Sequence, residues 1–389
     1  MIVKSILDTD LYKFSMSNAY FQLFPLAEGT FTFNDRGKEI YTKEFLKELW
    51  NALDNLGKLS LNEEEFQWVI KEIPYIPISY WEWLRTFRFD PTKIVASLSA
   101  EGHLQLCVTD KIWKATLYEV PLLEIISELR NKKYSLKEDK TIERLQEKIN
   151  LSEIHKLPFS EFGSRRRFSG DLHRKIVSEI KKNSNYCVGT SNVMLAKEFS
   201  MTPTGTQGHE YFMFHSGVFG YKRANYLGLE NWINVYDGSL GTALVDTFTT
   251  SSFLRTLTKK QAKLLDGFRI DSGDEYTIGK MIIKRLKELG VDPSTKLLVF
   301  SNALDFPKYQ KIYEYFSGIT KVSAGIGTNL TCDPVVLEDY KPANIVMKLS
   351  KCRMSDKDPW ENVIKISDDL GKHMGDEIEF KIAFHELHL

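Results

Sequence analysis

Residues 1–130 alternate between the helical and the strand period of hydrophobic positions. Apolar side chains recur at helical spacing over residues 11–23, directly after Asp8-Thr9-Asp10, which are residue types that cap a helix start. Strict alternation over residues 30–33 predicts a strand. Further helices are predicted at 43–53, 63–72 and 121–130, and a β-hairpin is predicted at 94–109. An N-terminal α+β domain is therefore predicted over residues 1–125, and segments from the C-terminus can complete it.

From about residue 157, short apolar segments alternate with amphipathic helical stretches. The apolar segments are predicted strands: 186–188, 201–204, 233–236, 243–248, 268–270, 297–300, 321–324 and 345–349. The helices between them are predicted at 171–182, 191–199, 275–289 and 306–316. This alternation is typical of parallel strands, and so many repeats favour a closed barrel over an open sheet. The chain is predicted to be an α/β protein, with an irregular α/β barrel over 126–350 and a C-terminal extension over 351–389.

Polar loops follow several of the predicted strands. In a barrel, the ligand site is built from the loops at the C-terminal ends of the strands. The loops that fit this position are Asp246-Thr247-Phe248-Thr249-Thr250, Arg269-Ile270-Asp271-Ser272-Gly273-Asp274, Ser301-Asn302-Ala303-Leu304-Asp305 and Gly325-Ile326-Gly327-Thr328-Asn329. Each is rich in small residues, hydroxyls or carboxylates, whereas its strand is apolar, so the loops are predicted to share one site.

The late loops have the residue types of a phosphate site. Gly325 and Gly327 expose backbone N–H groups beside the Thr328 hydroxyl, a combination that cradles phosphate; a plain turn is the alternative. Ser301, Asn302 and Asp305, one strand earlier, are candidates for binding a ribose or the same phosphate.

Arg269 and Asp271 lie two residues apart, so in a strand both side chains enter one pocket. The guanidinium can hold an anionic ring substituent, and the carboxylate can take a hydroxyl or a metal. A buried structural ion pair is the alternative.

A second glycine-rich motif, Gly205-Thr206-Gln207-Gly208-His209-Glu210, sets a tight backbone beside a histidine. This imidazole is a candidate general base, or a nucleophile towards a phosphoryl group. A strand-to-helix turn with a solvated histidine is the alternative.

Three successive arginines follow Glu161-Phe162-Gly163-Ser164, ending at Arg167. Successive side chains cannot all face one ligand, so one or two are predicted to bind phosphate or pyrophosphate. Phe162 is a candidate for stacking on an aromatic substrate or for core packing.

Composition limits the partners. The 389 residues contain 52 Lys plus Arg and 52 Asp plus Glu, so no global field attracts nucleic acid or an anionic membrane, and phosphate binding must be local. The sequence contains no apolar run of the ~20 residues that span a bilayer and no signal-peptide pattern. The four scattered cysteines do not predict a zinc site. A cytoplasmic enzyme that binds neither nucleic acid nor membrane is expected.

Taken in order, the five motifs at residues 8–13, 161–167, 205–210, 269–274 and 325–328 resemble those of the nicotinate phosphoribosyltransferase family. The resemblance runs from about residue 8 to residue 332, and the last fifty or so residues match nothing. It implies a type II phosphoribosyltransferase that works as a homodimer with sites at the interface. The implied reaction joins nicotinate to 5-phosphoribosyl 1-pyrophosphate, coupled to ATP hydrolysis and dependent on Mg²⁺.

The resemblance also implies roles for single residues. His209 is the residue that ATP phosphorylates, with Glu210 and Asp271 as further catalytic residues, and Mg²⁺ arrives with substrate, through Asp271. The implied nicotinate contacts are Tyr12, reaching across from the partner subunit, Phe162, Thr206 and Arg269. The implied phosphoribosyl and pyrophosphate contacts are Arg165, Arg167, Asp246, Ser301, Asn302, Asp305, Gly325, Gly327 and Thr328.

Other functions fit parts of this pattern. A nicotinamide phosphoribosyltransferase is expected to carry Asp where this chain has Gln207. A quinolinate enzyme must also decarboxylate, and no motif matches it. A catalytically silent barrel that binds a nucleotide is the alternative outside catalysis. An aldolase-like enzyme needs a Schiff-base lysine, and none of the strand-end loops offers one.

Overall fold

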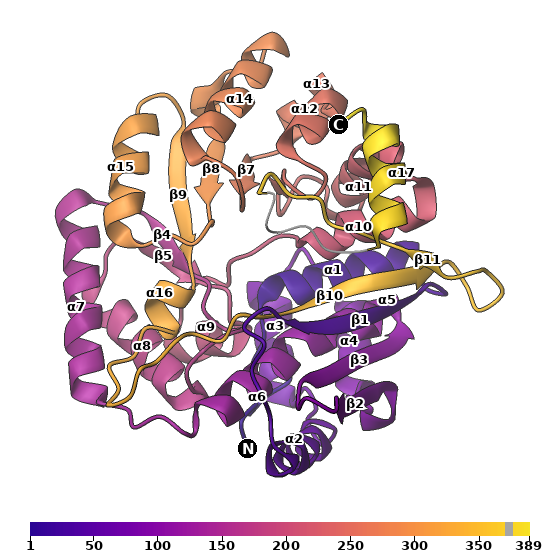
Figure 1. The fold of residues 1–389 in the computed structure, drawn as a ribbon. Coiled ribbons are helices and arrows are strands. Elements are labelled where there is room, and N and C mark those ends of the chain that lie inside the picture. The colour runs from indigo at the N-terminus through magenta and orange to yellow at the C-terminus, as the bar shows by residue number, and fades with distance from the viewer. Residues whose placement is uncertain (370–375) are drawn as a thin grey trace.

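The computed structural model describes residues 1–369 and 376–389, and it contains two sheets with their own helices (Figure 1). The longer helices are α1 (Leu11–Leu23), α2 (Lys43–Leu56), α3 (Glu63–Glu72), α4 (Ile78–Thr86), α6 (Glu119–Asn131), α7 (Glu138–His155), α8 (Gly170–Asn183), α10 (His209–Phe219), α11 (Tyr221–Tyr236), α14 (Glu275–Glu288), α15 (Phe306–Phe316) and α17 (Glu377–Leu387). The shorter ones are α5 (Ile112–Ala115), α9 (Val193–Phe199), α12 (Thr250–Thr256), α13 (Lys259–Leu264) and α16 (Thr328–Thr331).

The N-terminal sheet is antiparallel and has the order β11-β10-β1-β3-β2. Its strands are β1 (Glu28–Asp35), β2 (Ile94–Leu98), β3 (Leu104–Lys111), β10 (Ile345–Arg353) and β11 (Glu361–Asn362). The prediction that residues 345–349 form a strand of the barrel is wrong, because β10 pairs along the whole of β1. The C-terminal part of the chain thus returns to the N-terminal sheet.

The second sheet is parallel and has the order β5-β4-β9-β8-β7-β6. Its strands are β4 (Phe159–Glu161), β5 (Cys187–Thr190), β6 (Thr242–Leu244), β7 (Gly267–Ile270), β8 (Leu297–Phe300) and β9 (Lys321–Ile326). The predicted α/β class is confirmed. Among the described residues no ladder joins β5 to β6, so closure of the row into a barrel stays a prediction.

Local signals located most helices correctly. The capping box that Asn62 and Glu65 predict at the start of α3 is present, because each side chain accepts from the other residue's backbone N–H. Two predicted strands are wrong. Residues 233–236 form the last turn of α11, and residues 201–204 make a single bridge, from Pro203 to Thr190.

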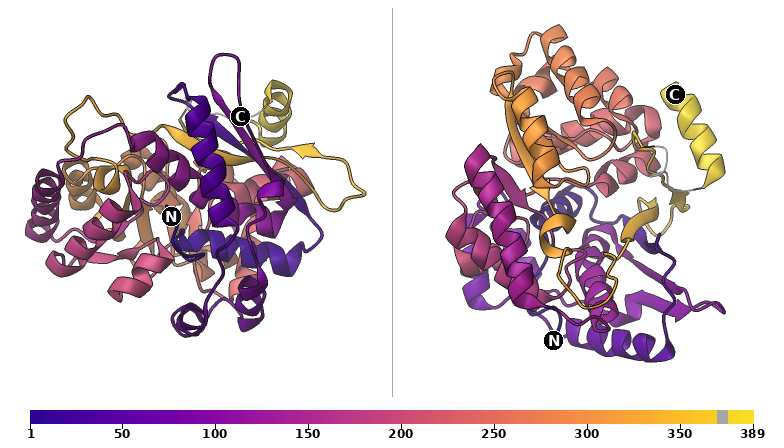
Figure 2. Two further views of the ribbon diagram at one scale, coloured as in Figure 1. Left: turned by 90° about the horizontal axis from the view of Figure 1, so that it is seen from below. Right: turned by 60° about the vertical axis from the view of Figure 1, so that its left-hand side comes forward.

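Two large hydrophobic cores correspond to the two sheets. The right-hand view of Figure 2 shows the N-terminal sheet with its helices at one end and the helices of the parallel sheet at the other. The C-terminal helix α17 packs against α11. Among the described residues, no helix combines the length and apolar character needed to cross a bilayer.

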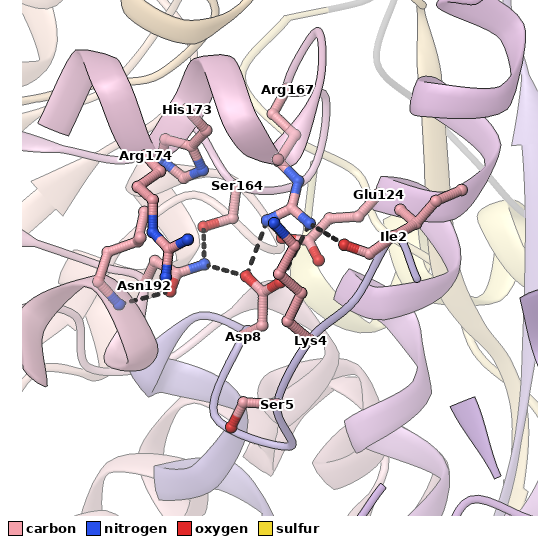
Figure 3. Close-up of polar contacts among 12 residues, drawn as sticks. Ile2, Lys4, Ser5, Asp8, Glu124, Ser164, Arg167, His173, Arg174 and Asn192 are labelled. Carbon is pink, nitrogen blue, oxygen red and sulfur yellow. Dashed lines mark hydrogen bonds and ion pairs between the residues drawn. The ribbon is translucent and has the colours of Figure 1, made fainter. Parts of the chain in front are cut away.

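A buried ion cluster joins the N-terminal segment to both halves of the chain (Figure 3). The Arg167 guanidinium, which is 1% exposed, donates to both carboxylate oxygens of Asp8, at 2.7 and 3.1 Å, and lies 3.1 Å from Glu124 in α6. Burial alone raises the pKa of Asp8, but Arg167 and a hydrogen bond from Asn192 hold it below its usual range. Burial raises the pKa of Glu124 well above its usual range, although Arg167 acts in the opposite direction.

We expect Arg167→Met to lower the free energy of unfolding by about 3–5 kcal/mol, because it leaves a buried carboxylate without its cation. The matched control is Arg174→Met, which removes an exposed pair with Glu198 and is expected to cost less than about 1 kcal/mol. Urea unfolding measures both. Equal losses for the two variants contradict the structural role of Arg167.

Candidate active site

His209 is the first residue of α10, and the two glycines before it shape the approach to it. Gly205 has φ of +127°, a conformation that side chains disfavour. A Cβ on Gly208 would lie 3.2 Å from the Tyr12 ring, so this glycine lets α1 pack directly on the loop. The motif therefore places the imidazole at the start of a helix, beside α1.

The His209 ring contacts groups from three distant segments. Its Nδ1 is hydrogen-bonded with the Thr247 hydroxyl at 3.1 Å, in the loop after β6. Its Nε2 lies 3.2 Å from a carboxylate oxygen of Asp271, after β7, and 2.8 Å from the Lys365 ammonium. A buried Asp246 oxygen lies 4.0 Å from the same nitrogen. The loops after β6 and β7 and the glycine motif therefore meet at His209, whereas a shared site with the Gly325–Asn329 loop stays a prediction.

These contacts set the charge of the histidine. Burial and the Lys365 ammonium lower the pKa of His209 to about 4, against the opposing effect of Asp246 and Asp271. Burial works to raise the pKa of Asp271, but the hydrogen bond with His209 and the Arg269 guanidinium hold it well below its usual range. At neutral pH the site holds a neutral imidazole beside an ionised carboxylate, and a neutral imidazole keeps a nucleophilic lone pair.

Residues around this centre are fixed by the neighbouring loops. The Ser301 hydroxyl donates to Asp271 at 2.8 Å, so the loops after β7 and β8 are joined. Arg269 donates to the Gln207 carbonyl at 3.3 Å, which ties β7 to the glycine motif. The Thr206 hydroxyl donates to the Thr242 carbonyl at 2.7 Å. Arg269, Asp271 and Ser301 thus belong to one group with His209.

The glycines after β9 allow a close approach of backbone segments. A Cβ on Gly325 would lie 2.4 Å from the Phe162 ring, and one on Gly327 would lie 2.7 Å from the Phe162 carbonyl oxygen. Gly325 ends up inside β9, Gly327 precedes the short helix α16, and Thr328 is exposed at its start. These glycines are therefore required for close packing against Phe162, which follows β4, whether or not a phosphate binds there.

Three side chains at the centre form one candidate metal site. His209, Asp246 and Asp271 have ligand atoms within 4.8 Å of one another. One Asp246 oxygen accepts from the Ser272 hydroxyl, and the other has no hydrogen-bond partner among the described residues. Carboxylate oxygens suit Mg²⁺, so Asp246 and Asp271 fit an ion that arrives with a substrate. The Lys365 ammonium, 3.8 Å from Asp246, already supplies one positive charge.

The family model of the nicotinate phosphoribosyltransferases matches residues 157–388, and the model of the N-terminal domain of that family matches residues 7–127. The chain belongs to the nicotinate phosphoribosyltransferase family. Curated relatives of that name include one from Methanosarcina mazei, 36% identical over 98% of this chain and 97% of its own, and one from Desulforapulum autotrophicum, 37% identical over 97% of each.

Solved structures agree with this assignment. A nicotinate phosphoribosyltransferase from Porphyromonas gingivalis superposes with a TM-score of 0.97 at 41% identity and covers all of both chains. The enzyme from Vibrio cholerae gives a TM-score of 0.93 at 30% identity, covering 100% of this chain and 95% of its own. The predicted family is confirmed, and it is favoured over the nicotinamide, quinolinate, aldolase-like and non-catalytic alternatives.

Within this family member, several predicted site residues lie elsewhere. Arg167 belongs to the buried Asp8 cluster and is not available to pyrophosphate. Asp305 is exposed and caps α15 by accepting from the Lys308 N–H. Glu210 forms a buried ion pair with Lys13. These side chains satisfy structural needs that adjacency in sequence does not reveal.

Other predicted residues have mixed positions. Arg165 lies 3.4 Å from Glu119, and 47% of its side chain is exposed. Asn302 donates to the Gly273 carbonyl at 3.3 Å. Tyr12 lies against Gly208 of its own chain, so α1 brings the ring to this loop within one subunit, and the expected contribution across a dimer interface stays a prediction. The Gln207 side chain is buried, with no partner among the described residues.

The C-terminal segment supplies residues that sequence reasoning missed. Its backbone is docked on the loops after β6 and β7, because the Ile366 N–H donates to the Thr247 carbonyl at 3.0 Å and the Gly273 N–H donates to Asp369 at 3.0 Å. This places Lys365 on His209. No sequence motif contains Lys365. It joins the site only because its segment docks beside His209, which is more than a hundred residues away in the chain.

A second missed lysine lies in β10. Burial, with Lys365 and Arg36 nearby, lowers the pKa of Lys348 to about 7, while Glu119 and Asp271 act in the opposite direction. Tyr12, and more weakly Asp271, raise the pKa of Arg165. Lys348, Lys365 and Arg165 therefore all interact electrostatically with the Asp271 carboxylate.

We predict that His209 stays neutral as the pH falls from its ordinary pKa of about 6.5 towards 4. The unfolded chain takes up that proton first, so the folded state loses stability over this pH window. NMR of histidine-labelled protein, with His209 assigned through His209→Asn, measures the midpoint. Lys365→Met is expected to raise it, because the ammonium lowers the pKa. A wild-type midpoint between 6 and 7 contradicts the described environment.

Proposed function

We propose that the chain is a nicotinate phosphoribosyltransferase that joins nicotinate to 5-phosphoribosyl 1-pyrophosphate, releases pyrophosphate and forms nicotinate mononucleotide, the first step of NAD salvage from nicotinate. The observation that carries this proposal is the convergence of the loops after β6, β7 and β8 with the glycine motif on His209. Family membership supports this reaction, and the geometry supports the residue roles proposed below.

The chemistry asks mainly for positioning. The ring nitrogen of nicotinate attacks the anomeric carbon as pyrophosphate leaves, and no protein nucleophile is needed for that step. The site has to align the two substrates and stabilise the charge that develops on the leaving group. Arg269, held at the glycine motif through Gln207, is the proposed partner of the nicotinate carboxylate, with Tyr12, Phe162 and Thr206 around the ring.

The leaving group requires positive charge. Lys348, Lys365 and the half-exposed Arg165 are the proposed contacts of pyrophosphate, since mutual repulsion among buried cations is relieved when a polyanion binds. Mg²⁺ bound to the substrate would be held by Asp271 and Asp246, and it would neutralise further charge on the phosphates. Gly325, Gly327 and Thr328 remain the proposed contacts of the 5′-phosphate.

ATP coupling is proposed to act through phosphorylation of His209. The imidazole is neutral, so a ring lone pair can accept a phosphoryl group. A phosphohistidine adds about two negative charges beside Asp271 and Asp246, and the Lys365 ammonium is the nearest compensating charge. Phosphorylation is therefore expected to draw Lys365 towards the phosphoryl group. This movement would change the electrostatic potential at the proposed pyrophosphate site. The proposed enzyme is a cytoplasmic homodimer.

Arg269→Met tests the substrate. Loss of the charge-assisted bond to the carboxylate is expected to reduce the preference for nicotinate over nicotinamide, measured as the ratio of kcat/KM, by about 10- to 100-fold. Pyrophosphate release reports both reactions, and the ratio cancels general damage to the enzyme. An equal loss with both substrates would show that Arg269 does not read the carboxylate.

His209→Asn tests the coupling. We expect slow transfer without ATP to persist and stimulation by ATP to disappear, because the acceptor nitrogen is lost. The measurements are initial rates with and without ATP, and acid-labile ³²P incorporation from ATP. His385→Asn, on the exposed face of α17, is the control and should retain both. Full ATP stimulation in His209→Asn excludes this residue as acceptor.

A further inference from the structure

Lys13 in α1 is a fully buried lysine that neither the motifs nor the reaction assigns to a role. Its ammonium forms ion pairs with Glu119, at the start of α6, and with Glu210, the neighbour of His209 in α10. The Thr116 hydroxyl donates to Glu210 and lies 3.5 Å from the ammonium. One side chain thus connects three helices below the active centre.

The cluster continues to a half-exposed side chain. The second oxygen of Glu119 lies 3.4 Å from Arg165, whose side chain is the exposed end of the series. Basic and acidic side chains therefore alternate in the order Glu210, Lys13, Glu119 and Arg165. His209 is covalently next to one end, and the proposed pyrophosphate contact is the other end.

The ion pair between Lys13 and Glu119 decides how strongly Glu119 attracts Arg165. A buried carboxylate requires a cation, and removing one partner of a buried pair leaves an expensive uncompensated charge. With Lys13 present, Glu119 has a buried partner, and the half-exposed Arg165 guanidinium keeps donors for an anion. Without Lys13, Arg165 is the nearest cation that can neutralise Glu119, so it is drawn inward and away from the proposed pyrophosphate site.

We propose that Lys13 is a positioning residue of the transfer reaction: it pairs with Glu119 and Glu210 so that Arg165 stays available to the pyrophosphate group and His209 keeps its place at the start of α10. The inference rests on the proposed function, because it assigns Arg165 to the pyrophosphate side. Lys13 itself touches no substrate.

The test compares Lys13→Met with the double variant Lys13→Met/Glu119→Gln. Lys13→Met is expected to weaken pyrophosphate binding in calorimetry, and to raise KM for 5-phosphoribosyl 1-pyrophosphate, by about 10- to 100-fold, with a smaller change in kcat. The double variant removes the Glu119 carboxylate that attracts Arg165, so pyrophosphate affinity is expected to recover to within about threefold of wild type. Lys13→Arg keeps the charge and serves as the conservative control.

The rescue separates positioning from packing. If Lys13 only supports the fold, the double variant binds pyrophosphate as weakly as Lys13→Met, and the proposal is overturned. If Lys13→Met does not fold, Glu119→Gln alone decides, since pyrophosphate affinity at or above the wild-type value supports the proposal and a tenfold loss refutes it. A wild-type chain without transferase activity contradicts the proposed function instead, whereas the calorimetric comparison still tests the position of Arg165.

Discussion

A buried charge has to meet an opposite charge within the protein, and in this chain that requirement ties together segments that lie far apart in sequence. Arg167 pairs with Asp8, Lys13 joins α1 to α6 and α10, and Lys365 lies 3.8 Å from Asp246. Each pair crosses between elements that the backbone hydrogen bonds of the two sheets do not connect. The position of the active centre follows from these pairs as much as from the parallel sheet.

The same requirement explains how a neutral chain can bind a polyanion. Arg167 and Lys13 are buried cations, and each contacts two carboxylates. Lys348, Lys365 and Arg165 each interact electrostatically with the Asp271 carboxylate, and burial, with Lys365 and Arg36 nearby, lowers the pKa of Lys348. Overall neutrality therefore hides a local excess of positive charge where the phosphates are proposed to bind.

The sequence was informative where function depends on neighbouring residues. The helix cap of α3, the β7 loop and the glycine motif are local patterns, and the structure has them close to their predicted positions. The prediction of a strand at residues 233–236 failed, because a short apolar run fits a buried helix turn as well as a strand. Lys365 and β10 could not be predicted, since their partners are set by the return of the chain and not by spacing. Three consecutive arginines did not reveal that Arg167 points inward whereas Arg165 remains half exposed.

We propose that pyrophosphate binds near His209, on the cations Lys348, Lys365 and Arg165. A crystal structure of the chain with bound pyrophosphate tests it most directly. The account predicts phosphate oxygens within hydrogen-bonding distance, about 3 Å, of Lys348, Lys365 and Arg165. Pyrophosphate bound at a site remote from the His209 ring, with these three side chains unchanged, would contradict it.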